Sequence, residues 1–227
     1  MASNEGPGSV DPAAAEAASA FGELVKLMAR LRGPGGCPWD REQTHQSISL
    51  NLLEEAYETV EAIDLNDSDH LAEELGDLLL QVVFHSQMAA ETGDFDIARV
   101  VQDLITKLVG RHPHVFGDQA AGTSAEVLAN WEAIKSKEKG RDSLGDGIPK
   151  GLPALVHAHK ALRRLAGAGA EYQGSGARLI ELCRAMENEP SEELVGEILF
   201  EAAALAKDSG IDPEGALRKE ATRRLAR

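Results

Sequence analysis

The sequence is poor in cysteine and in aromatic residues. Its two cysteines, Cys37 and Cys183, lie far apart and form no CxxC motif. A disulfide framework is therefore not expected, which fits a reducing, cytoplasmic location. Aromatic residues make up only 4% of the chain, and runs of β-branched residues are scarce. This composition favours helices over sheets, and we expect an all-α fold.

Basic residues and long apolar runs are also lacking. The chain has 23 Lys and Arg against 38 Asp and Glu, a formal net charge of −15. Nucleic acid is not an expected partner, because its binding needs a basic face that neutralises phosphates. No apolar run is long enough to span a membrane, so no membrane segment is expected either. An acidic protein can still bind a phosphorylated small molecule where a metal ion or a group of Lys and Arg reverses the local field.

The hydrophobic pattern predicts a succession of helices. Residues 1–20 contain neither a basic start nor an apolar core, so they are not a secretory signal, and we expect a disordered tail. Beyond this tail, apolar residues recur with a helical period between Gly, Pro and Asp turns. The fold is thus expected to consist of helical bundles. The predicted helices cover residues 14–32, 45–65, 69–92, 96–110, 124–140, 153–168, 176–187, 191–209 and 212–226.

Two of the predicted helices carry paired acids beside their apolar faces. Residues 53–58 read LEEAYE and residues 74–77 read ELGD. On a helical wheel, the acids flank an apolar arc in each helix, so antiparallel packing through the two arcs would gather four carboxylates at one edge. The arcs consist of Leu52, Ala56, Thr59, Val60 and Ile63 in the first helix and Leu71, Leu75, Leu78, Leu79 and Val82 in the second.

Four carboxylates at one edge need a counter-charge. Each close pair would repel by on the order of 4 kcal/mol at an effective dielectric constant of about 20. Carboxylate oxygens completed by water are the ligands that Mg²⁺ or Mn²⁺ prefers. The pattern therefore indicates a Mg²⁺ site, with Mn²⁺ as the substitute, formed by Glu55, Glu58, Glu74 and Asp77. Solvated surface charge on the flanks of two helices is the alternative, and spacing alone does not decide between the two.

At these acids the chain resembles the MazG family of nucleoside triphosphate pyrophosphohydrolases, within the all-α NTP pyrophosphatase superfamily. The family pattern of EExxE, a spacer and ExxD reads here as Glu54-Glu55-x-x-Glu58, a spacer and Glu74-x-x-Asp77. The resemblance covers about residues 21–227, and several flanking blocks match in register. These blocks are GCPWDREQTH (36–45), EELGDLLLQVVFHSQMA (73–89), RHPHVFGD (111–118), WEAIKSKEK (131–139) and IPKGLPAL (148–155).

The resemblance implies an activity and a set of site residues. The activity is Mg²⁺-dependent hydrolysis of an NTP or dNTP between the α- and β-phosphates, giving NMP and pyrophosphate, by a homodimer with broad base tolerance. The four carboxylates would be the metal ligands and catalytic residues. Lys107 and Arg111, four apart on one helix face, would meet the triphosphate; ordinary charges near a helix C-terminus are the alternative. Trp39, in the CPWD loop, would stack on the base or wall the pocket, and simple packing is the alternative.

The second half of the chain echoes the first. Segments 73–96 and 192–214 share an acidic start, a Gly, an apolar stretch and a Gly/Asp turn. We therefore expect two tandem MazG-like helical modules, a catalytic one at 21–147 and a second at 148–227.

The second module is expected to be degenerate. Aligning GEILF (196–200) with GDLLL (76–80) places Leu194 and Glu197 where the first module has its second acidic pair. Arg184 stands where the first module has Glu58, and we expect Glu197 to face it. Two of four ligands are thus lost, so this module is expected to bind no metal.

Two other functions stay open. One is a narrower dUTPase- or dCTPase-like dNTP pyrophosphatase, against which the RHPHVF and WEAIK blocks argue. The other is a catalytically silent helical protein that regulates or binds another protein, against which the intact set of four acids argues. Base and sugar preference, the physiological substrate and the number of Mg²⁺ ions do not follow from the sequence.

Overall fold

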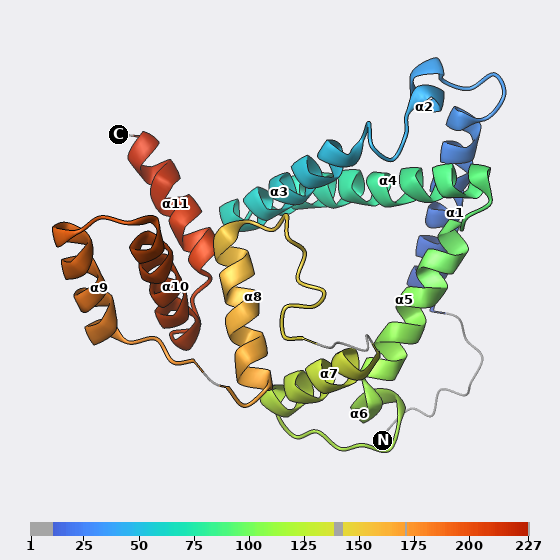
Figure 1. The fold of residues 1–227 in the computed structure, drawn as a ribbon. Coiled ribbons are helices and arrows are strands. Elements are labelled where there is room, and N and C mark those ends of the chain that lie inside the picture. The colour runs from blue at the N-terminus through green and yellow to red at the C-terminus, as the bar shows by residue number, and fades with distance from the viewer. Residues whose placement is uncertain (1–10, 139–142, 171, 227) are drawn as a thin grey trace. The chain divides into compact units, whose positions relative to one another are not determined.

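The computed structural model describes residues 11–138, 143–170 and 172–226, and within these ranges every regular element is a helix (Figure 1). The all-α prediction is therefore confirmed for the described residues. The chain divides into two compact units, Met1–Leu108 and Val109–Arg227, and the division falls inside one helix. In the described part of the chain, no helix is both long and apolar enough to cross a membrane.

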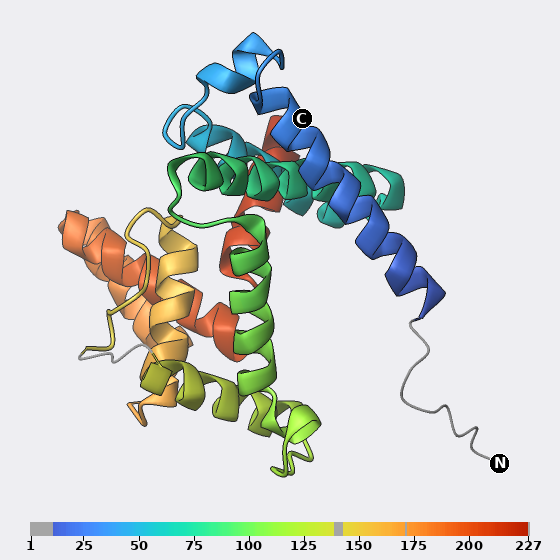
Figure 2. The same cartoon turned by 90° about the vertical axis from the view of Figure 1, so that its right-hand side faces the viewer.

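In the first unit, two long helices lie side by side and a third packs on one of them. α3 runs along α4, and α1 packs against α4 and α2 (Figure 2). The helices of this unit are α1 (Pro12–Arg32), α2 (Pro38–Glu42), α3 (Ser49–Leu65), α4 (Ser68–Thr92) and most of α5 (Ile97–Arg111).

In the second unit, α10 is the central helix, because it packs against α8, α9 and α11, while α7 contacts α8. The core consists of Leu162, Ala203 and Ala204, against which Tyr172 and Phe200 pack. The helices here are α6 (Pro113–Phe116), α7 (Ser124–Glu138), α8 (Ala154–Gly167), α9 (Gly176–Asn188), α10 (Glu192–Asp208) and α11 (Pro213–Leu225).

The predicted helices are confirmed, and the differences lie at helix ends and in short helices. α2 and α6, each a short helix with Pro in its first turn, were not predicted because they have too few residues to show a period. α1 begins at Pro12, so the part of the expected tail from residue 12 onward is helical. Asp11 caps this helix by accepting a hydrogen bond from the Ala13 N–H, and an Ala-rich first half sustains it. Residues 1–10 and 139–140 lie outside the described residues.

A tight connection makes α3 and α4 an antiparallel pair. Asn66 ends α3 in the left-handed conformation, with φ of 55°, which Asn tolerates better than most residues. Asp67 then caps α4, because its side chain accepts hydrogen bonds from the N–H groups of Asp69 and His70. A connection of two residues sends the chain back along α3, which brings the two acidic pairs to the same level.

The core of the first unit lies between α1 and α4, and not along the two predicted apolar arcs. Its buried residues include Phe84 and Met88 of α4 and Met28 of α1. Several residues of the predicted arcs, among them Ile63 and Leu75, stay exposed. The arc prediction is wrong for α4 because it considered only the pairing of two helices, whereas α1 covers a different face of α4.

Candidate metal and phosphate site

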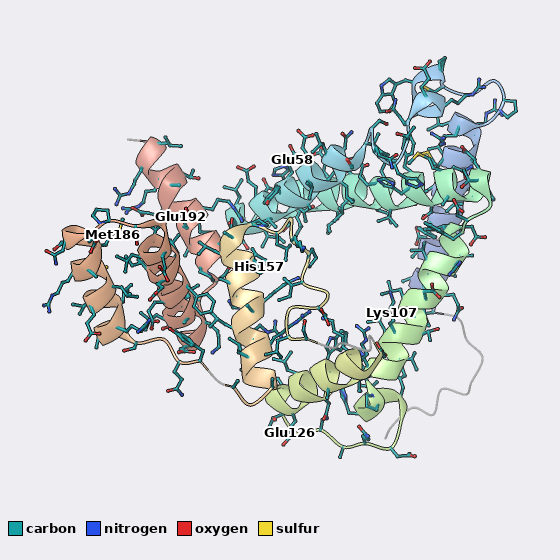
Figure 3. All side chains as sticks on the ribbon, viewed as in Figure 1. Glu58, Lys107, Glu126, His157, Met186 and Glu192 are labelled. Carbon is teal, nitrogen blue, oxygen red and sulfur yellow. The ribbon has the colours of Figure 1, made fainter. Side chains whose placement is uncertain are left out.

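Three of the four predicted carboxylates converge between α3 and α4. Glu55 and Glu58 are three residues apart on α3, where Figure 3 marks Glu58, and Glu74 faces them from α4. Each offers a carboxylate oxygen, and these oxygens all lie within 4.8 Å of one another. Asp77 is not part of this group of three, but among the neighbouring charges it is the one that raises the pKa of Glu55 most. The first acidic pair and Glu74 therefore meet as the spacing predicts.

The electrostatics of the group show that the carboxylates repel one another. The pKa of Glu55 is raised above its ordinary value, first by burial and then by the charges of Asp77, Glu58, Glu74 and Glu54. A raised pKa means that the protein environment opposes the negative charge of this group. A cation placed among these oxygens would remove the opposition.

Glu74 shows most directly that this group is suited to a cation. Its side chain is buried, with 8% of the residue exposed. His70 Nε2 lies 3.0 Å from Glu74 Oε1, one helical turn away on α4. Glu74 Oε2 is buried and has no hydrogen-bond partner. Such an atom is costly unless something binds it, and an all-oxygen set of donors is what Mg²⁺ or Mn²⁺ requires. The residues present therefore fit the implied metal.

The predicted phosphate-binding residues are on α5. Lys107 is exposed and belongs to the same unit as the carboxylates (Figure 3). Arg111 belongs to the second unit, and its side chain is only 11% exposed. It donates hydrogen bonds from Nε and Nη2 to Glu138 Oε2 over 3.0 and 2.6 Å, and its guanidinium carbon lies 5.4 Å from the ring centre of Trp131. Arg111 is thus held by an acid and an aromatic ring, a pairing that sequence reasoning missed.

Trp39 lies on α2 in the first unit and is 57% exposed. Its side chain is therefore not buried in the core of this unit. Its backbone carbonyl accepts a hydrogen bond from the Gln43 side chain over 2.8 Å, which fastens the loop that follows. The predicted role at the base stays a prediction.

Sequence reasoning assigned no role to three polar residues that lie on or beside the continuation of this side of α4. Gln81 and His85 follow Asp77 on α4 at intervals of four residues, and Gln81 is 5% exposed. His45, from the loop after α2, places its Nδ1 atom 2.7 Å from Nδ1 of His85. The spacing of 77, 81 and 85 is a helical stripe, and that signal was available in the sequence.

In the second unit, one of the residues that the predicted alignment compares with the acidic pairs has a different partner from the one expected. The prediction that Glu197 faces Arg184 is wrong: Arg178 Nη2 lies 2.8 Å from Glu197 Oε2. Arg178 lies one helical turn before the buried Leu182 and so shares its face toward α10, whereas Arg184 lies two residues after Leu182 and on another face. Within the described ranges, Glu55, Glu58 and Glu74 form the only group of three or more such side chains close enough to share an ion.

An unpredicted acid, Glu201, is buried in the second unit with 1% of the residue exposed. It accepts hydrogen bonds from the Tyr172 hydroxyl and the Ser175 N–H, and Arg178 Nε lies 3.7 Å from its Oε2. Gly174 is required beside it, since a Cβ there would lie 2.4 Å from the Leu205 backbone nitrogen. The charge of this acid is therefore balanced by the protein's own groups.

Comparison with known proteins identifies the family. The model of the MazG nucleotide pyrophosphohydrolase domain matches residues 43–116, a segment that contains all four predicted carboxylates, Lys107 and Arg111 but not Trp39. The chain is 43% identical over 220 residues to the nucleoside triphosphate pyrophosphohydrolase/pyrophosphatase MazG of Thermotoga maritima, covering 92% of this chain and 84% of that protein.

Other relatives carry similar names. The nucleoside triphosphate pyrophosphohydrolase of Escherichia coli K12 is 43% identical over 212 residues, which cover 86% of this chain and 81% of that protein. A protein of the same name from Mycobacterium tuberculosis is 43% identical over 149 residues, covering 65% of this chain and 45% of that protein. Identity at this level over nearly the whole of two such proteins shows kinship, and the chain belongs to the MazG nucleotide pyrophosphohydrolase family.

Proposed function

We infer that this chain is an enzyme, a nucleoside triphosphate pyrophosphohydrolase. The observation that carries the inference is the convergence of Glu55, Glu58 and Glu74, with one buried Glu74 oxygen left without a partner, in a chain whose full-length relatives bear that name. Family membership alone would fit a silent relative as well. The intact carboxylate group favours an active one.

We propose Mg²⁺ as the cofactor, held by Glu55, Glu58, Glu74 and Asp77. When bound, it would supply neutralisation of phosphate oxygens and help to lower the pKa of a water molecule. The chain's own contribution is to hold the ligands in place. Thr59 donates a hydrogen bond to the Glu55 carbonyl over 2.7 Å, and His70 Nε2 lies 3.0 Å from Glu74 Oε1. These contacts come from the same two helices as the ligands, so the site is built on rigid elements.

The substrate would be an NTP or dNTP, cleaved between the α- and β-phosphates. Lys107 and Arg111 are proposed to bind the phosphates that leave as pyrophosphate. Arg111 would have to exchange Glu138 for a phosphate, and this exchange replaces its two charge-assisted hydrogen bonds to a carboxylate by charge-assisted hydrogen bonds to a phosphate. Its position over Trp131 would keep the guanidinium oriented meanwhile.

A homodimer is proposed because apolar helix faces stay exposed in the single chain. On α5, large apolar side chains recur at the spacing of one helix face, and each is at least 37% exposed. A second copy with the same stripe could cover them. These residues are Val101, Leu104, Ile105, Leu108 and Val109. Sedimentation should give a dimer at micromolar concentration, and a monomer there would count against this proposal.

Residues 148–227 are proposed to form a second MazG-like module that has lost metal binding. The support is that Arg178 stands beside Glu197 and Glu201, where a cation would otherwise be needed. The proposed role of this module is packing.

The test is a phosphate-release assay on ATP, GTP, dUTP and dCTP with added inorganic pyrophosphatase, with and without Mg²⁺. Turnover of several of these should require both Mg²⁺ and the added pyrophosphatase. Activity on dUTP or dCTP alone would favour the narrower enzyme, and no activity would favour a silent protein. Glu74→Ala should abolish turnover, while Glu61→Ala, on the exposed side of α3, is the matched control.

A further inference from the structure

Buried polar atoms without partners are concentrated along one stripe of α4. In the described part of the chain five buried side-chain nitrogen or oxygen atoms have no hydrogen-bond partner, and three of them are Glu74 Oε2, Gln81 Oε1 and His85 Nε2. At 3.6 residues per turn these three positions fall within an arc of about 40°. Each buried polar atom without a partner calls for an explanation, and three of them in one row point to a common explanation.

The stripe begins at the proposed metal site and leads away from it. Gln81 lies about 6 Å and His85 about 12 Å beyond Asp77 along the helix axis, at 1.5 Å per residue. A nucleotide whose α-phosphate lies at the carboxylates has to extend its sugar and base over a comparable length. The row of orphan atoms therefore runs where the rest of a substrate could lie.

The chemistry of the stripe changes along it from charged to neutral. Gln81 carries an uncharged amide. Burial and then the neighbouring His45 lower the pKa of His85, so this ring is neutral near pH 7. His45 and His85 are nearly parallel, at 11°, and their bond joins the two Nδ1 atoms, so only one of the two can carry a proton. Neutral groups are poor ligands for phosphates but good ones for the hydrogen-bonding edge of a base.

We propose that Gln81 and His85, with His45 behind it, form the nucleobase subsite of the same active site. This rests on the proposed function. The Gln81 amide offers either a donor or an acceptor, and the Nε2 atom of His85 is a donor or an acceptor according to which histidine holds the shared proton. The two residues can therefore match both a base edge with an amino group and one with a carbonyl, which would account for broad base tolerance.

Access to this subsite needs a small movement, because the orphan atoms are covered in the absence of a ligand. The same is true of Glu74 Oε2 in the proposed metal site. His45 is exposed, and it lies on the short loop between α2 and α3. One hydrogen bond between two histidine rings is a weak latch, so the loop can shift and admit a base edge to the orphan Nε2 atom of His85.

The test compares substrates with and without a base. We would measure kcat/KM with Mg²⁺ for dATP, dCTP, dGTP and dTTP and for 2′-deoxyribose 5′-triphosphate, which has no base. Gln81→Met and His85→Phe keep the side-chain volume and remove the hydrogen-bonding atoms. Each should lower kcat/KM for the four dNTPs roughly 3- to 10-fold, the effect of one neutral hydrogen bond. Neither should change it for the triphosphate without a base. Gln87→Ala is the control, since Gln87 lies on the same helix and donates to Glu91.

An equal loss on all five substrates would overturn the subsite and indicate a structural role, and so would no loss on any. The proposed function would stand in both cases, because wild-type turnover with Mg²⁺ is measured in the same series. Failure of the wild type on every nucleotide would instead remove both proposals.

A second measurement needs no variant and so does not depend on how Gln81→Met or His85→Phe folds. In the wild-type protein with ¹⁵N-labelled histidine and Mg²⁺, adding dCMP should shift the ring-nitrogen resonances of His45 and His85. Deoxyribose 5-phosphate should leave them in place. Equal shifts with the two ligands, or none with dCMP at saturation, would overturn the proposal.

Discussion

Replacing Glu55 by Gln should make the metal-free protein more stable. A Gln side chain has almost the same shape as Glu but carries no charge. The pKa of Glu55 is raised by burial and by neighbouring acids, so the charge of Glu55 is unfavourable in the folded state. In the unfolded chain these acids are far apart and this cost disappears. Removing the charge therefore stabilises the folded state relative to the unfolded one.

The size of the gain follows from the distances. Two charges 4.8 Å apart, the outer limit within the carboxylate group, repel by about 3.5 kcal/mol at an effective dielectric constant of about 20 and by about 0.9 kcal/mol in bulk water. Glu55 is half-buried, so its environment lies between these limits. We expect the free energy of unfolding to rise by about 1–3 kcal/mol, or the melting temperature by roughly 2–12 °C for a chain of this size.

Thermal unfolding in EDTA and in Mg²⁺ tests this. In EDTA, Glu55→Gln should have a higher melting temperature than the wild type. Glu61→Gln, on the exposed side of the same helix, should have the melting temperature of the wild type. Mg²⁺ at a hundred times its dissociation constant should then raise the free energy of unfolding of the wild type by about 2.7 kcal/mol. Mg²⁺ should raise the free energy of unfolding of Glu55→Gln by less, because the Gln amide is a weaker metal ligand than the Glu carboxylate. A Glu55→Gln protein that melts below the wild type in EDTA would refute the account of the site as a group of mutually repelling carboxylates.

Three further predictions concern phosphate binding, pH and the second module. Lys107→Ala and Arg111→Ala should raise KM for NTP more than they weaken NMP binding, because NMP lacks the β- and γ-phosphates; equal losses in a binding titration would indicate a structural role. The pKa of Glu55 is raised in the folded state, so the folded protein binds more protons than the unfolded one above pH 4.5. Lowering the pH from 7 in EDTA should therefore reduce the destabilisation that the Glu55 charge causes in the wild type. Glu55→Gln lacks this charge and should not show the effect. The fragment 1–147 should keep Mg²⁺-dependent hydrolysis with lower solubility, as assayed on purified protein; a soluble, helical fragment without activity would show that residues 148–227 complete the site.

The helices and the acidic group could be predicted because both depend on local spacing. Glu55 and Glu58 share a flank of α3 by helical periodicity, and the LNDSDH turn, with Asp67 as cap, folds α4 back along α3. These relations need no knowledge of distant contacts. Residue spacing and turn chemistry are therefore enough to predict them.

Contacts between distant segments could not be predicted in the same way. The stripe of α4 that α1 buries is one example, since Phe84 and Met88 are no more apolar than Leu75, which stays exposed. The pairing of Arg111 with Trp131 and that of His45 with His85 are others. Each joins residues whose separation along the chain has no fixed period, so only packing decides which of several candidates meet.

The central claim is that the carboxylate group between α3 and α4 serves a pyrophosphohydrolase. The most direct measurement is the identity of the products formed from an NTP, resolved by anion-exchange chromatography or ³¹P NMR with Mg²⁺ and then with EDTA. We predict NMP and pyrophosphate in equal amounts with Mg²⁺, neither with EDTA, and neither from Glu74→Ala under either condition. Formation of NDP and phosphate, or undiminished turnover by Glu74→Ala, would contradict the account.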